Sequence, residues 1–187
     1  MSEYDATEAS RQMANLFRIG RVTALDVKAK RAKVAVAGLE TDWIPWMAQR
    51  AGRTRSWSPP RVGEQVVLGS PFGDLGQAII LGSLFQDDMP PSAESADQEA
   101  VLFPDGSTVD YNSATHTLTV NVVQGGSVVV NCQSATVKAA GSIMLDTPDV
   151  HVTGNVTVDG DVTAGPISLR NHVHTEQGDG APVSKPQ

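Results

Sequence analysis

The chain has 187 residues, 40% of them hydrophobic, and a formal net charge of −7. This length suffices for one good-sized domain or for a small domain with an extension, and the composition excludes a disordered tail. No run approaches the roughly 18 apolar residues of a membrane helix. The acidic start of the chain lacks the apolar stretch of a signal peptide, so we expect a protein made in the cytoplasm.

The single cysteine limits how the fold can be stabilised. Cys132 has no second cysteine in the chain to pair with. Stability therefore has to come from packing, from a metal or from oligomerisation. We expect Cys132, which follows three valines, to be a small buried apolar residue rather than a nucleophile, because no base is suggested beside it.

Charge and aromatic residues divide the chain into two differently built halves. Residues 1–97 carry 11 Lys or Arg and 12 Asp or Glu, whereas residues 98–187 carry 3 and 9. All three tryptophans lie before residue 60. Because phosphate binding needs a basic face, the acidic second half is a poor candidate for contact with nucleic acid.

The first half begins with a short helix and continues as short strands. Residues 5–17 place Met13, Leu16 and Phe17 three or four apart, which predicts a helix within an amino-terminal arm, 1–17. Alternating patterns bounded by turn residues then predict five strands, at 20–26, 32–36, 41–46, 63–68 and 77–81. Five short strands with one long loop, 50–60, favour a small β-barrel over residues 18–86.

A linker separates this barrel from the second half. Residues 87–100 are acidic, contain Pro90 and Pro91, and offer only Met89 as a large apolar residue. From residue 101 the chain is rich in Val, Thr, Ser, Asn, Asp and Gly and shows no helical pattern. Residues 117–122 alternate polar and apolar side chains, as a half-buried strand does.

A six-residue repeat near the carboxyl end predicts a β-helix. Three consecutive hexads start with an apolar-x-apolar pattern, and turn residues follow: Val150–Asn155, Val156–Asp161 and Val162–Ile167. One chain wound alone needs about three hexads for each coil and at least about three coils. Three hexads would leave the valines in water, whereas three chains around one axis would shelter them. We therefore expect a trimeric β-helix over 101–165, with half of an ordinary β-sandwich as the alternative.

His172 and His174 form the most specific motif in the chain. On a strand, positions i and i+2 project to the same side, so the two imidazoles would share a face. Three chains meeting at an axis would supply six imidazoles, enough for an octahedral shell. Six ligands favour iron over zinc, since structural zinc prefers four. The pair would then lie in a metal-binding apex, 166–187; the alternative is two solvated histidines near a flexible tail.

The remaining polar candidates carry weaker signals. His116 and His151 lie in strand patterns without a partner at a useful spacing, so we expect them to face solvent. No catalytic cluster and no phosphate-binding glycine motif is recognisable, which favours a protein that is not an enzyme. A basic loop could stack on nucleic acid or dock a protein, and the acidic chain favours a protein; its residues are Arg50, Arg53, Arg55, Trp57 and Arg61.

Several short segments in a fixed order resemble the baseplate assembly protein V family. This family comprises the tail spikes of contractile-tailed phages, with the spike of R-type pyocins and the needles of type-six secretion as related proteins. The matching segments span nearly the whole chain: Phe17–Val22, Thr41–Trp46, Ala51–Gly52, Pro60–Val67, Pro71–Asp74, Phe103–Tyr111 and His172–His174.

The resemblance implies an all-β protein with an OB-fold domain at about 18–85, an intertwined trimeric β-helix needle and a short pointed apex. It implies that His172 and His174 of three chains hold one iron ion just inside the tip. It further implies a spike assembled in the baseplate of a phage tail or bacteriocin particle, made in the bacterial cytoplasm. Its expected partners are the baseplate hub and tail tube proteins, contacted through the OB-fold, and, transiently, a bacterial outer membrane.

Two rival functions belong to other classes of protein. A nucleic-acid-binding OB-fold protein would bind in a salt-sensitive manner that depends on the 50–61 loop. A β-helical carbohydrate-active enzyme would need a catalytic cluster, and its turnover would be lost on substitution of a single His or carboxylate.

Overall fold

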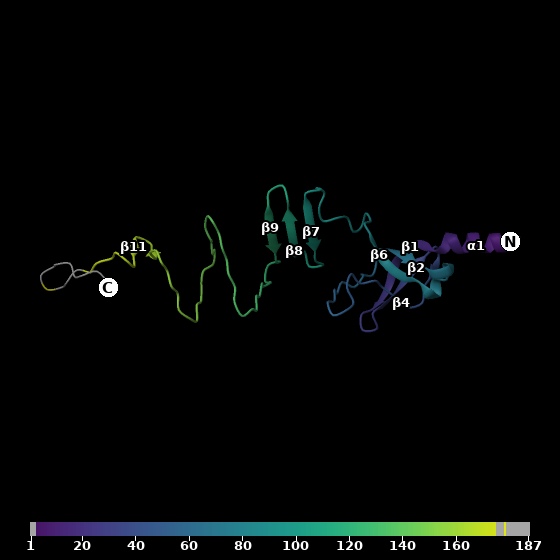
Figure 1. Ribbon diagram of the computed structural model, residues 1–187, viewed down its shortest axis with the longest axis horizontal. Coiled ribbons are helices and arrows are strands. Elements are labelled where there is room, and N and C mark those ends of the chain that lie inside the picture. The colour runs from purple at the N-terminus through teal and green to yellow at the C-terminus, as the bar shows by residue number, and fades with distance from the viewer. Residues whose placement is uncertain (1–2, 175–177, 179–187) are drawn as a thin grey trace. The chain divides into compact units, whose positions relative to one another are not determined.

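The computed structural model describes residues 3–174 and 178, which fall in two compact units, Met1–Val130 and Asn131–Gln187. Strands dominate its regular structure, which confirms the predicted all-β class (Figure 1). The expected short helix is also present, as α1 (Glu3–Asn15). Among the described residues, no helix has both the length and the apolar character needed to cross a membrane.

Helix α1 is stabilised by a charge cluster one turn from its start. The Glu8 carboxylate accepts two hydrogen bonds from the Arg11 guanidinium, at 2.7 and 2.8 Å, and a third from Gln12 at 3.0 Å. These bonds, those of Arg11 first, lower the pKa of Glu8 to about 2. Glu8 therefore keeps its charge and its pairing with Arg11 until the pH falls toward 2.

A six-stranded antiparallel sheet follows the helix and curls into a small barrel. Its members are β1 (Phe17–Asp26), β2 (Arg31–Val36), β3 (Leu39–Glu40), β4 (Ile44–Pro45), β5 (Gln65–Gly69) and β6 (Ile79–Leu84). The strand order is β3-β2-β1-β5-β6, with β4 also paired to β2. A bridge between Trp46 and Ile80, with the Met47 N–H bonded to the Ile80 carbonyl at 2.8 Å, joins the chain after β4 to β6. This closure brings the two ends of the sheet together, as in a partly open OB-type barrel.

The barrel core follows from strict alternation along its strands. In β2 and β5 every second side chain is buried, and the residues between them are partly or fully exposed. The buried apolar set is Val22, Ala32, Val34, Val36, Ile44, Val66, Leu68, Ala78 and Ile80. Small and β-branched residues predominate because a narrow barrel leaves little interior volume.

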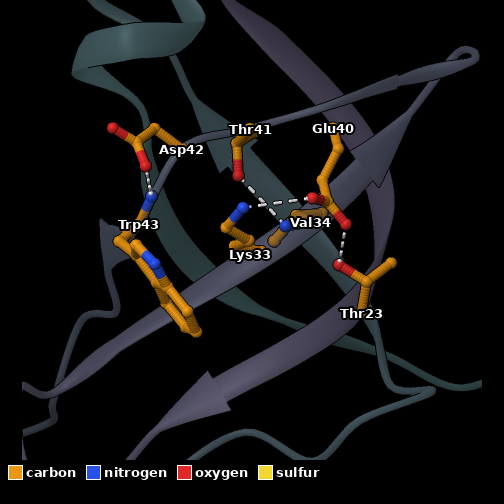
Figure 2. Close-up of polar contacts among 7 residues, drawn as sticks. All are labelled: Thr23, Lys33, Val34, Glu40, Thr41, Asp42 and Trp43. Atoms are coloured by element: carbon orange, nitrogen blue, oxygen red, sulfur yellow. Dashed lines mark hydrogen bonds and ion pairs between the residues drawn. The ribbon is translucent and has the colours of Figure 1, made fainter.

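Polar contacts fix the turn after β3 (Figure 2). The buried Thr41 exchanges two bonds with Val34: its N–H donates to the Val34 carbonyl at 2.9 Å, and its hydroxyl accepts from the Val34 N–H at 3.0 Å. The neighbouring Glu40 carboxylate accepts from the Thr23 hydroxyl at 2.8 Å and pairs with Lys33 at 3.3 Å. The bond from Thr23, followed by that from Lys33, holds the pKa of Glu40 below its ordinary value.

Gly20 is required where β1 passes over β2. A Cβ at this position would lie 2.5 Å from Val34 Cγ1 and 2.7 Å from the Ala35 carbonyl oxygen. We expect Gly20→Ala to lower the free energy of unfolding of the barrel by about 1–3 kcal/mol, the usual cost of overpacking a core. Tryptophan fluorescence during denaturation measures this change, because all three tryptophans belong to the barrel segment.

Gly82→Ala is the matched control for this substitution. Gly82 lies in β6, and a Cβ there would meet no atom within 4 Å. The same added methyl group is therefore expected to leave the unfolding midpoint nearly unchanged. Equal destabilisation by both substitutions would contradict the packing argument.

A three-stranded meander comes next, and its first strand includes the last three residues of the predicted linker, 98–100. It comprises β7 (Gln98–Leu102), β8 (Thr108–Asn112) and β9 (Thr117–Asn121), paired in that order (Figure 1). The turn between β7 and β8 is held by Asp105, which accepts bonds from both the N–H and the hydroxyl of Ser107. These bonds hold the pKa of Asp105 below its ordinary value.

The meander has one mainly apolar face, and this face lies open. The register places Glu99 at its edge, beside Tyr111. It pairs Val101 with Val109, Val109 with Val120, and Tyr111 with Leu118, so these five side chains project to one side. Each of them is between 39% and 66% exposed. The other face of β8 and β9 is polar, with Thr108, Asp110, Asn112, Thr117, Thr119 and Asn121.

The chain between β9 and the last hairpin is extended and has no partner strand within the described residues (Figure 1). From residue 124 to residue 161, the described backbone makes one backbone–backbone hydrogen bond, from Gly126 N–H to the Val123 carbonyl. The hexad valines are exposed, from 42% at Val162 to 68% at Val156. The β-helix expected over 101–165 is therefore not formed by one copy of the chain.

Candidate metal site near the carboxyl end

A short hairpin precedes the two histidines. It consists of β10 (Thr163–Ala164) and β11 (Ile167–Ser168), which pair antiparallel across a turn at Gly165 and Pro166. Gly165 has φ +60°, a left-handed conformation that glycine adopts without steric cost. A further backbone bond, from Leu169 N–H to the Val162 carbonyl at 2.9 Å, extends the hairpin by one pair.

Asp161 ties the base of this hairpin together. Its Oδ1 accepts from the Val162 N–H at 2.9 Å and from the Arg170 N–H at 3.0 Å, and its Oδ2 accepts from the Ser168 hydroxyl. These bonds, that of Ser168 first, hold the pKa of Asp161 below its ordinary value. The carboxylate therefore links Val162, at the start of the hairpin, to Ser168 and Arg170, at its end.

His172 lies on the turn that follows β11. Its backbone N–H donates to the Ser168 carbonyl at 2.9 Å. Its Nδ1 lies 3.0 Å from the same oxygen and 3.2 Å from the Leu169 carbonyl oxygen. Since a carbonyl only accepts, Nδ1 carries a proton, and in the neutral imidazole the lone pair is on Nε2.

The two histidine rings contact each other edge to face, with centroids 5.1 Å apart and an interplanar angle of 77°. The prediction that they lie on a strand is wrong for the single chain, because β11 ends at Ser168 and the i to i−4 bond of His172 turns the backbone. The two rings nevertheless lie close together. His172 is partly buried and His174 is exposed.

The donor set fits a metal only if further ligands are added. In the described part of the chain, no group of three or more His, Cys, Asp or Glu is placed to hold an ion. The pair supplies two imidazoles, of which His172 has Nε2 available and Nδ1 bonded to carbonyl groups. This is the usual arrangement of a metal-binding histidine, whose second nitrogen is fixed by a hydrogen bond.

The other candidate residues lie away from this pair in the sequence and join no metal-binding group among the described residues. His116, at φ +54°, occupies the turn between β8 and β9, and His151 lies on the extended segment, so neither is in a strand as the pattern predicted. Both are exposed, as expected. The expectation that Cys132 is buried is wrong for one copy of the chain: Cys132 is exposed, as are all residues from 121 to 161. Of the expected apex, the segment after His174 lies outside the described residues, except Gly178.

Two residues of this region were not anticipated from the sequence. Asp161 and Ser168 are seven positions apart, and their bond forms only once Gly165 has reversed the chain. Asp161 is the last residue of a hexad, where the repeat predicts an ordinary turn residue. Motifs of fixed spacing, such as those for metal ligands or catalytic groups, therefore do not identify this pair from the sequence.

The basic loop of the barrel borders a separate groove of about 690 Å³. Trp57 packs against Trp46 there, with ring centroids 5.9 Å apart. Of the loop arginines, Arg61 lines the groove, together with Phe103 from the chain after β7. The groove thus combines apolar and aromatic walls with one basic and one acidic residue, Arg61 and Glu64.

Comparison with known proteins finds a matching family model in each half of the chain. Residues 18–85 match the family model of the type VI secretion system/phage-baseplate injector OB domain. Residues 131–176, which include both histidines, match the phage spike trimer model. The spike protein of Escherichia phage P2 is 36% identical over 175 residues, a region that covers 90% of this chain and 83% of that protein.

An injector OB domain followed by a spike domain defines a structural component of the phage baseplate. The start of the spike match, at residue 131, coincides with the division between the two compact units. The chain belongs to the family of phage baseplate spike proteins, as the sequence motifs predicted.

Proposed function

We propose that three copies of this chain assemble into the membrane-piercing tip of a contractile tail or bacteriocin particle, capped by one metal ion. The observation that carries the proposal is the set of exposed apolar side chains and unpaired backbone groups in the described part of a single copy. Two regions contribute to this set, the meander and the segment that follows it.

The apolar face of the meander supports association through the sheet. Val101, Val109, Tyr111, Leu118 and Val120 form one continuous surface while the opposite face of β8 and β9 is polar. Complete burial of one such side chain stabilises by about 1.5–3 kcal/mol. Three sheets arranged as a prism would bury all three apolar faces on one axis and keep the polar faces in water.

The extended segment supports association through strand pairing. Exposed valines cost free energy because their apolar surface is in water. Burying them also removes the neighbouring N–H and C=O groups from water, so these groups then need hydrogen-bond partners. Winding three copies about an axis pairs each segment with its neighbours and turns the hexad valines inward. The match of this region to a spike trimer model supports the number three.

The histidine pair supports a metal on that axis. Three copies would contribute six imidazoles from His172 and His174, and an octahedral set of six nitrogens suits iron better than zinc. The ion would cross-link the chains near their carboxyl ends and stabilise the folded trimer by its binding energy. The metal is thus structural in this proposal, and the protein is not an enzyme.

The mechanical role follows from the interwound trimer. No chain can leave such a needle alone, so a compressive load does not peel off one subunit. The acidic second half limits adhesion to anionic lipid head groups, which suits transient contact with a bacterial outer membrane. The OB-fold domain is the part that binds the baseplate hub and tail tube, and nucleic acid is not a partner. The chain is made in the bacterial cytoplasm and assembled into the baseplate.

Molar mass in solution combined with elemental analysis tests the proposal. We expect a particle of three times the 19.7 kDa of one chain, with about one iron for every three chains. A metal-free monomer would exclude the proposed assembly. A trimer without metal would exclude the ion and leave the needle.

A further inference from the structure

We propose that Asp161 is a positioning residue for the metal ligand His172, acting through Ser168. The inference rests on the proposed metal site and extends it from the ligands to the residues that orient them. Neither Asp161 nor Ser168 contacts the imidazole with its own side chain. Together they hold the backbone carbonyl that does.

The connection runs through two groups of Ser168. Its hydroxyl donates to Asp161 Oδ2 and accepts from the Asn171 N–H at 3.0 Å. Its carbonyl accepts from the backbone N–H of His172 at 2.9 Å and from Nδ1 at 3.0 Å. The hydroxyl of Ser168 is thus bonded to the Asp161 carboxylate, and its carbonyl is bonded to His172.

A second route reaches the same turn. Asp161 Oδ1 accepts from the Arg170 N–H at 3.0 Å, which fixes the backbone two residues before His172. The turn 168–172 is therefore anchored at its first residue and again at Arg170. Without the carboxylate, the hairpin would keep only its short β10–β11 ladder and the Leu169 bond.

Holding this turn matters because ligand orientation determines metal affinity. The bond from Nδ1 to the Ser168 carbonyl selects the tautomer with a lone pair on Nε2 and sets the direction in which it points. Loss of such supporting groups typically costs about 10–100-fold in metal affinity. Since each chain contributes one such turn, a substitution at Asp161 would remove the support of His172 in all three chains of the trimer.

The test compares iron release from purified trimers. Wild type, Asp161→Ala, Asp161→Asn and Ser168→Ala are loaded with ferrous iron and mixed with a chromophoric chelator in excess, and molar mass is measured in parallel. We expect Asp161→Ala to remain trimeric and to release iron at least about tenfold faster. Asp161→Asn keeps one carbonyl oxygen for the Val162 and Arg170 N–H groups, so it should restore much of the slow release.

Asp159→Ala is the matched control. Asp159 lies two residues before Asp161 in the same hexad, and its carboxylate makes no hydrogen bond within the described part of the chain. Its removal changes the net charge equally but leaves the hairpin bonds in place. We expect iron release at the wild-type rate.

The outcomes separate this inference from the metal site itself. A wild-type trimer that binds no iron overturns both. Iron retained by wild type and by Asp161→Ala with equal release rates overturns the positioning role and leaves the site. If Asp161→Ala does not assemble, Ser168→Ala decides: faster release supports the role, and an unchanged rate overturns it.

Discussion

Replacing Val120 with aspartate is expected to abolish the trimer. Val120 lies at the end of β9 on the open apolar face, paired with Val109, and is 52% exposed in one copy. In the proposed assembly, three carboxylates would enter one apolar interior, and each buried ion costs several kcal/mol in addition to the lost valine contacts. Molar mass in solution should fall from three chains to one.

Asn121→Asp provides the control for the Val120 substitution. It adds the same charge one residue further along β9, on the polar face beside Thr108. Because that face stays in water, we expect this variant to remain trimeric. Dissociation of both variants, or of neither, would show that the apolar face is not the contact between copies.

Removing His172 and His174 together is expected to lower bound iron to less than about one tenth of the wild-type amount. All six proposed ligands come from these two positions, so the double variant His172→Ala/His174→Ala leaves the ion without a coordination shell. Elemental analysis of the purified trimer measures the loss. Thermal unfolding should also begin at a lower temperature, because the binding energy of the ion no longer stabilises the folded state.

His151→Ala tests whether the loss is specific. His151 is also exposed and lies in the same compact unit, on the extended segment. We expect its removal to leave the iron content unchanged. Iron retained by the double variant would mean that other residues hold the ion, and the proposed site would be wrong.

These variants separate two sources of stability in the proposed spike. Valines and strand pairing would hold most of its length, and the metal would hold the end, where the apolar residues are fewer. The Val120 substitution should disrupt assembly whether or not iron is present. The histidine substitutions should leave a trimer that is less stable to heat.

Much of the fold could be predicted from local patterns. Period-two alternation identified the barrel strands, since a half-buried strand shows its two faces directly in its sequence. The five predicted strands correspond to β1, β2, β4, β5 and β6. Strand β3 was missed because its two residues, Leu39 and Glu40, are both exposed and show no alternation. The baseplate family was recognisable from short motifs whose order is more specific than any one of them.

Other features depended on contacts that the sequence pattern does not contain. The bond between Asp161 and Ser168 requires the reversal at Gly165, and the closure of the barrel requires Trp46 to meet Ile80 across 34 positions. The histidines were placed on a strand because their i, i+2 spacing suits one, but a backbone bond from His172 to Ser168 forms a turn instead. The first two contacts join distant or reversed segments, and the third is a turn bond over four residues; a period-two pattern contains none of them.

The sequence by itself determined the order of the parts: a helix, a small barrel, an acidic linker, a valine-rich repeat and a histidine pair. These parts can be recognised because hydrophobic periodicity and turn residues are signals within a few consecutive positions, which do not depend on contacts with distant segments. Only the tertiary structure decided which face of the meander is left open and which nitrogen of His172 remains available. Both depend on strand register and on a reversed turn, which arise when segments of the folded chain meet.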